Sequence, residues 1–113
     1  MLKVFAYLTR REGLETEEFI QYYENRHVPL VLNLVSAPPL VYKRNYIVRG
    51  DEFNREDETI DFDVVTELVF SDRAGFTTWI EELSVDAIAA DEEQFLARSR
   101  TRAYVVDERV TAG

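Results

Sequence analysis

The sequence predicts an α+β fold in which helices cover one face of a four-stranded antiparallel sheet. Four segments have the composition of strands, two longer regions have helical periodicity, and together they follow the order β-α-β-β-α-β. The chain has 113 residues, of which 46% are hydrophobic, and this is the usual size of one folded unit with one core. We therefore expect a single domain over residues 1–113.

The first strand is expected at residues 2–9. Side chains alternate between the two faces of a strand, and here both faces contain apolar side chains. One face has Leu2, Val4, Ala6 and Leu8, and the other includes Phe5 and Tyr7. Residues 40–48, 61–70 and 101–108 are rich in aromatic and β-branched residues and predict the other three strands. The charged segment 49–61 is typical of a loop.

The first helix is expected to have Thr16 as its N-cap, followed by two glutamates that suit the positive end of the helix dipole. Its apolar stripe continues to Leu34 and includes His27, the one histidine of the chain. His27 should therefore point inward. Pro29 follows two residues later, where it is expected to break the helix.

The second helical region is expected after residue 70. Ser71 or Asp72 can cap its first part, and a further helical piece covers residues 86–99, with an interruption or a new cap near Asp91.

The predicted order is that of ferredoxin-like folds, which place both helical regions on one face of the sheet. The other face is then left bare, although the first strand carries Phe5 and Tyr7 on one side and Val4 and Leu8 on the other. A second copy packed sheet to sheet would cover this bare face. We therefore expect a homodimer.

Composition excludes several classes of function. Thirteen basic and twenty-two acidic residues give a net charge of −9, which disfavours nucleic acid and anionic membrane surfaces as partners. No cysteine is present, and no apolar run has the ~18 residues of a membrane span. We expect a cytoplasmic protein without a metal or cofactor, since one histidine without cysteine is a poor zinc set and the glycines form no phosphate-binding or dinucleotide motif.

His27 is the first candidate for chemistry, because imidazole transfers protons near neutral pH. Asp63 and Glu67 share one face of the third predicted strand and could form a polar pocket with it. The structural alternatives are a neutral core histidine, an Asp63 at the exposed start of the strand, and a Glu67 paired with Arg44 or Arg102.

Aromatic and basic side chains provide candidates for substrate binding. Tyr7, Tyr23 and Tyr42 could line a pocket for a flat organic ligand, although most aromatic residues fill the core. Arg10, Arg11 and Arg44 could hold an anionic substrate, and surface solvation is their default role.

Three stretches of the sequence together resemble the EthD family of the dimeric α/β-barrel superfamily: LTRREGLETEEFIQYYENRHVPLV, FDVVTELVF and ADEEQFL. The resemblance spans nearly the whole chain. It implies a ferredoxin-like protomer, a dimeric barrel and small-molecule chemistry, with a pocket between the sheet and its helices. It places the motif histidine at His27, the strand aspartate at Asp63 and a further acidic position at Glu67.

These observations lead to one functional hypothesis and two alternatives. The first is a cofactor-free enzyme acting on a small cyclic or aromatic carbonyl compound, of the isomerase, cyclase or dehydratase type, in which His27 shuttles a proton while Asp63 or Glu67 orients it. The first alternative is a cofactor-independent monooxygenase of aromatic polyketide-like substrates. The second is a non-catalytic dimeric protein that binds a small molecule or serves as an accessory subunit.

Overall fold

The computed structural model describes residues 1–55 and 60–113. Part of the predicted loop at 49–61, namely 56–59, lies outside the described residues. The elements in chain order are β1 (Leu2–Leu8), α1 (Thr16–Tyr22), the π-helical turn η1 (Tyr23–His27), α2 (Val28–Leu34), β2 (Val41–Tyr46), β3 (Val64–Phe70), α3 (Arg73–Leu83), α4 (Asp86–Glu93), the 3₁₀ turn η2 (Arg98–Arg100) and β4 (Arg102–Val106).

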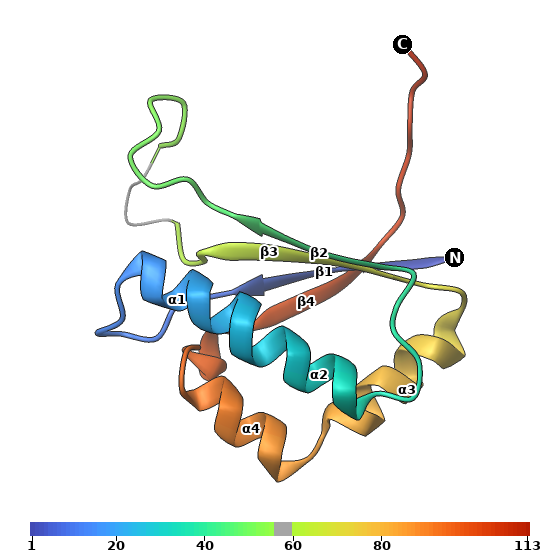
Figure 1. Ribbon diagram of the computed structural model, residues 1–113. Coiled ribbons are helices and arrows are strands. Elements are labelled where there is room, and N and C mark those ends of the chain that lie inside the picture. Colours follow the sequence, from blue (N-terminus) through green and yellow to red (C-terminus); the bar gives the residue numbers. More distant parts are fainter. Residues whose placement is uncertain (56–59) are drawn as a thin grey trace.

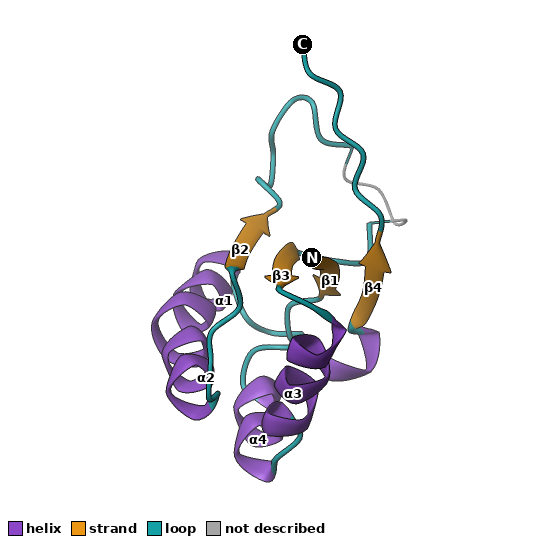
Figure 2. Ribbon diagram, turned by 90° about the vertical axis from the view of Figure 1, so that its right-hand side faces the viewer, coloured by secondary structure: helices purple, strands orange, loops and turns teal. Residues whose placement is uncertain are grey.

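The four strands form one antiparallel sheet with the spatial order β2-β3-β1-β4. All helices lie on the same side of it, with α1 and α2 in one group and α3 and α4 in the other (Figures 1 and 2). The predicted β-α-β-β-α-β order, the α+β class and the single helical layer are therefore confirmed.

The start of α1 differs by one residue from the prediction. Glu15 is the N-cap and Thr16 is already helical. The carboxylate of Glu18 accepts a hydrogen bond from the backbone N–H of Glu15 at 3.1 Å. This contact satisfies a backbone donor at the beginning of the helix, as the glutamate of a capping box does.

The helical region continues through Pro29 instead of ending there. The backbone N–H of Val28 donates to the carbonyl of Tyr23, five residues earlier, so the turn is wider than an α-turn. The hydrogen-bond pattern thus shifts just before Pro29, whose nitrogen cannot donate. Pro29 then occupies the first turn of α2, where its missing N–H is tolerated.

The second helical region contains two helices. Asp72 caps α3 by accepting a hydrogen bond from the N–H of Gly75 at 2.8 Å, as predicted. The helical piece predicted over 86–99 is interrupted two residues after Asp91, since α4 ends at Glu93 and the 3₁₀ turn η2 begins at Arg98, but Asp91 itself lies inside α4 and is not a new cap. The side chain of Asp91 bonds to side chains of the first helical region and does not cap its own backbone.

Two groups of buried side chains fill the space between the sheet and the helices. The larger group includes Phe19 and Tyr23 from the first helical region and Phe95 after α4. The smaller group, around Val4 and Leu68, also contacts Phe70, Phe76 and Trp79.

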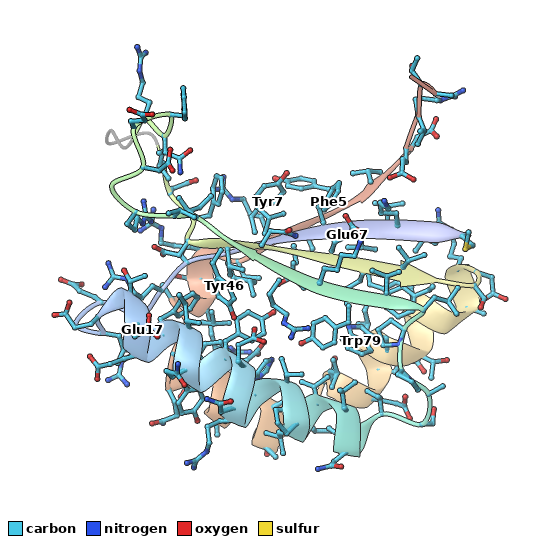
Figure 3. All side chains as sticks on the ribbon, turned by 45° about the horizontal axis from the view of Figure 1, so that its top comes forward. Phe5, Tyr7, Glu17, Tyr46, Glu67 and Trp79 are labelled. Carbon is cyan, nitrogen blue, oxygen red and sulfur yellow. The ribbon has the colours of Figure 1, made fainter. Side chains whose placement is uncertain are left out.

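The other face of the sheet carries no helix of the described residues. Figure 3 shows Phe5, Tyr7 and Glu67 on this bare face, whereas Tyr46 and Trp79 lie between the sheet and the helices. The segment after β2 and the C-terminal tail project past the bare face at opposite ends of the sheet (Figure 1). In the described part of the chain, no helix is both long enough and apolar enough to cross a membrane.

Candidate functional site

His27 lies at the end of η1 and makes a short hydrogen bond to an acidic side chain of α4. Its Nδ1 atom lies 2.7 Å from Oδ2 of Asp91. His27 is only 7% exposed, so it points inward as the helical stripe predicts. When the carboxylate accepts from Nδ1–H, the lone pair of the imidazole is on Nε2.

Tyr22 supports the same carboxylate. Its hydroxyl donates to Oδ1 of Asp91 at 2.7 Å, so each oxygen of Asp91 has a partner in the first helical region. Burial, together with the neighbouring Asp91 carboxylate, raises the pKa of Tyr22 to about 12. Tyr22 therefore remains a hydrogen-bond donor throughout the neutral pH range.

Aromatic rings enclose the imidazole. The ring centroid of Phe95 lies 4.9 Å from that of His27, and the Tyr23 ring meets it edge-on at 5.5 Å. Nε2 has no hydrogen-bond partner among the described residues. The His27 side chain as a whole keeps 9% of its accessible surface.

A chain of hydroxyl groups continues from Tyr23 toward the sheet. The hydroxyl groups of Tyr23 and Thr66 are 2.7 Å apart, and the Tyr42 hydroxyl also interacts with Tyr23. Burial raises the pKa of Tyr23 to about 12 and raises the pKa of Tyr42 as well. Both phenols are therefore protonated hydrogen-bonding groups at neutral pH.

An ion pair lies beside these tyrosines. Arg44 binds both carboxylate oxygens of Glu24, with nitrogen-to-oxygen distances of 2.7 and 2.9 Å. Tyr46 donates to the same carboxylate at 2.6 Å, and the guanidinium lies 4.8 Å from the ring centroid of Tyr42. The bonds from Arg44 lower the pKa of Glu24, and those to Glu24 raise the pKa of Arg44.

The carboxylate next to His27 is thus Asp91, and not Asp63 or Glu67 as expected. Asp63 precedes β3 and accepts a hydrogen bond from the backbone N–H of Arg10 at 2.7 Å as well as one from Arg49. These contacts hold the side chain of Asp63, which is buried. The alternative that Asp63 lies at an exposed strand start is therefore wrong.

Glu67 lies on the bare face of the sheet, as does Tyr7 (Figure 3). Its carboxylate is 3.8 Å from the ammonium of Lys3 and 3.9 Å from that of Lys43, so its basic partners are lysines and neither Arg44 nor Arg102. Of the seven residues predicted for the site, the helix-facing side of the sheet brings together His27, Tyr23, Tyr42 and Arg44.

Asp91 was missed, although the sequence contains a signal for it. Ile88, Asp91 and Phe95 are spaced as one face of a helix, and two of them are core residues. An aspartate on an apolar stripe needs a buried polar partner. The lone inward histidine of the first helical region is such a partner.

The clefts found on the described residues are lined by other groups. One on the bare face includes Lys3, Lys43 and Glu67, and one near Trp79 includes residues 36–40. No cluster of three or more His, Cys, Asp or Glu side chains suited to a metal ion occurs in the described residues.

The fold is that of the ferredoxin-like α+β proteins, and in this chain a buried histidine contacts a half-buried aspartate between the helices. The chain belongs to the EthD family, because the family model described as EthD domain matches residues 11–99. No match occurs among proteins with curated descriptions.

Solved structures with the same fold were also found. An EthD family protein from Bacillus halodurans has a TM-score of 0.63 and 18% identity, over 96% of this chain and 100% of that one. HapK from Hahella chejuensis has a TM-score of 0.59 and 10% identity, over 100% of this chain and 96% of that one. A dimeric ferredoxin-like protein of unknown function from Thermobifida fusca has a TM-score of 0.55 and 15% identity, over 93% of this chain and 88% of that one. At these identities, the likeness shows the fold alone.

Proposed function

We propose that this protein is a cofactor-independent enzyme that moves a proton on a small cyclic or aromatic carbonyl compound, such as a lactone or a polyketide intermediate. The observation that carries the proposal is the 2.7 Å contact between Nδ1 of His27 and Asp91. A carboxylate on one ring nitrogen fixes the tautomer and leaves the other nitrogen available as a base.

In this proposal, Nε2 of His27 removes a proton from a carbon next to the substrate carbonyl and returns it at another position. Asp91 orients the ring and stabilises the imidazolium that forms. Tyr22 is a positioning residue, since it touches Asp91 and not the substrate. No electron acceptor is needed, because the proton leaves and returns without a change in oxidation state.

Tyr42 and Arg44, which Tyr23 links to His27, supply the substrate contacts. Tyr42 keeps its proton and can donate a hydrogen bond to the oxygen of a developing enolate. Arg44, which stacks on Tyr42 and is held by Glu24, adds positive charge nearby. Because His27 is nearly buried, the substrate reaches Nε2 by a local opening between η1 and α4.

The test is deuterium exchange at carbons next to the carbonyl group of lactones and cyclic ketones, followed by proton NMR in D₂O. His27→Gln should lower the exchange rate by at least ~10², the scale of general base catalysis. Asn25→Ser, an exposed change on the same turn, is the control and should leave the rate unchanged. Equal rates for wild type and His27→Gln on a confirmed substrate would remove the proposal.

The oxidative alternative uses the same residues with an aromatic phenol as the substrate. His27 would deprotonate the phenol, and dioxygen would then react with the electron-rich ring. Oxygen consumption with an anthrone-like phenol separates this reaction from isomerisation, which consumes none.

The enclosure of His27 by Tyr23 and Phe95 favours a second candidate, a non-catalytic small-molecule-binding or accessory protein. In that case, the contact between His27 and Asp91 only fastens η1 to α4. His27→Gln would then lower the melting temperature and leave the affinity for a bound ligand unchanged.

We also propose that the protein is a homodimer joined through the bare face. This face carries Phe5, Tyr7 and Val65, and two fully solvated apolar side chains occur on the segments that project past it, Phe53 at 87% and Val110 at 81% exposure. Apolar surface of this extent marks an interaction site. A fold relative is itself described as a dimeric ferredoxin-like protein.

A further inference from the structure

Two adjoining clefts lie beside the end of β1 and the starts of β3 and β4. Figure 1 shows where these strand ends lie in the sheet. The volumes of the two clefts are about 320 and 250 Å³, and both clefts are lined by Asp61 and Arg100. We call them together the arginine cleft, because its lining includes Arg10, Arg49, Arg100 and Arg102. This concentration of arginines is unusual in a chain with a net charge of −9.

Three carboxylates line the arginine cleft, those of Glu12, Asp61 and Asp63, and the last two are already engaged. Asp63 accepts from the backbone N–H of Arg10 and from the side chain of Arg49. Asp61 binds Arg102, and this bond lowers the pKa of Asp61. Neither carboxylate makes a hydrogen bond to the guanidinium of Arg10 or Arg100 in the described structure.

The guanidinium of Arg10 has unused hydrogen-bonding capacity. Its Nη1 donates to the carbonyl of Leu14, but its Nε is buried without a hydrogen-bond partner in the described structure. The nearest acidic atom, Oδ1 of Asp63, is 3.9 Å away, which is too far for a hydrogen bond. Buried polar atoms are almost always paired, so an orphan of this kind indicates an acceptor that the protein itself does not supply.

Arg100 supplies a second guanidinium. It is exposed, it lines both parts of the arginine cleft, and it forms no salt bridge within the described residues, although its charge helps to lower the pKa of Asp61. The hydroxyl group of Ser99 adjoins it in the smaller part. Planar guanidinium groups bind carboxylate and phosphate oxygens through paired hydrogen bonds.

We propose that the arginine cleft binds the carboxylate or phosphate group of a small anion, held by Arg10 and Arg100. The volumes suit a small molecule, whereas the negative field of the whole chain opposes an extended polyanion such as nucleic acid. This site is separate from His27 and does not depend on the reaction proposed for it.

The test uses the full chain labelled with ¹⁵N and follows the Nε–H signals of the arginines by NMR. Inorganic phosphate and succinate are titrated separately, at an ionic strength held constant with sodium chloride. The signals of Arg10 and Arg100 should shift in a saturable manner. The ligand with the lower dissociation constant then identifies phosphate or carboxylate as the preferred group.

Arg100→Gln should weaken this binding about tenfold, the effect of losing one charge-assisted contact. Arg73→Gln removes the same charge from an exposed position in α3 and should leave the affinity unchanged. Arg10→Lys, which keeps the charge but loses the planar donor set, should also weaken binding. Absence of saturable shifts in the wild type, or equal weakening in Arg100→Gln and Arg73→Gln, would overturn the proposal.

Discussion

Oδ2 of Asp91 lies 2.7 Å from Nδ1 of His27, although 64 positions separate the two residues in the sequence. The contact joins η1 to α4 beneath the sheet, and the hydroxyl of Tyr22 completes it on the other carboxylate oxygen. The same carboxylate therefore links the two helical groups and sets the tautomer of the one imidazole in the chain.

Asp91→Asn should lower the free energy of unfolding by about 1–3 kcal/mol. The amide of asparagine can accept from only one side, so either His27 or Tyr22 then faces an N–H₂ group and loses its acceptor. Urea denaturation followed by circular dichroism measures the change. If His27 acts as a base, kcat on a confirmed substrate should also fall more than KM rises.

Glu93→Gln is the control for this change, since Glu93 is exposed on the same helix. Its effect on the unfolding free energy should stay within about 0.5 kcal/mol. An Asp91→Asn protein as stable as the Glu93→Gln protein would show that the buried contact contributes nothing.

The fold was largely predictable because short-range patterns determine it. Alternation located the first strand, and aromatic and β-branched residues located the other three. The apolar stripe around Phe19 and Tyr23 located the first helix with His27 inside it. Pro29 was misinterpreted because a proline also fits the first turn of a new helical segment when a wider turn precedes it.

The acid partner of His27 was not predicted, because it depends on how α4 packs against η1. Asp63 and Glu67 were chosen as neighbours on one strand face, but the helices cover the opposite face, which carries Val64, Leu68 and Phe70. The face with Val64, Leu68 and Phe70 is more apolar than the face with Asp63 and Glu67. This difference in the sequence indicated which face the helices cover.

Tyr22 and Tyr23 should make the protein sensitive to alkali. The pKa of each is about 12 in the folded chain and 10.0 in the reference state, so the unfolded chain releases these protons first. Their stabilising contribution is complete below pH 10 and is lost as the pH rises toward 12. Urea denaturation at several pH values should show the unfolding free energy falling over this interval.

Tyr22→Phe isolates one of these two contributions. The variant should lose about 1 kcal/mol at neutral pH, since Asp91 loses a donor, and its stability should decline less steeply above pH 10. Tyrosine absorbance during alkaline titration should show one fewer late-ionising group. An unchanged alkaline profile for this variant contradicts the assignment.

Glu24→Gln should destabilise the protein at neutral pH by about 1 kcal/mol, because Arg44 and Tyr46 lose a charged acceptor. The pKa of Glu24 is lowered from 4.5 on folding, so its contribution exists above pH 4.5 and disappears as the pH falls through the lowered value. The difference between the wild type and the variant should thus shrink in acid. Chemical denaturation at pH 7 and below pH 4 measures it.

Glu81→Gln changes an exposed glutamate of α3 and is the control. Its stability difference from the wild type should be small at both pH values. A difference for Glu24→Gln that persists in acid would mean that packing, and not the ion pair, causes the loss.

Val65→Arg should convert the proposed dimer to monomers. Val65 lies on the bare face in β3, one of the two central strands, opposite Tyr7 of β1, and an arginine there would place an unpaired charge in an apolar interface. Light scattering after size-exclusion chromatography should give the mass of two chains for the wild type and of one chain for the variant. Ile80→Arg adds the same charge to an exposed position on the helical side and should remain dimeric. A wild type with the mass of one chain at micromolar concentration would rule out the bare face as a stable interface.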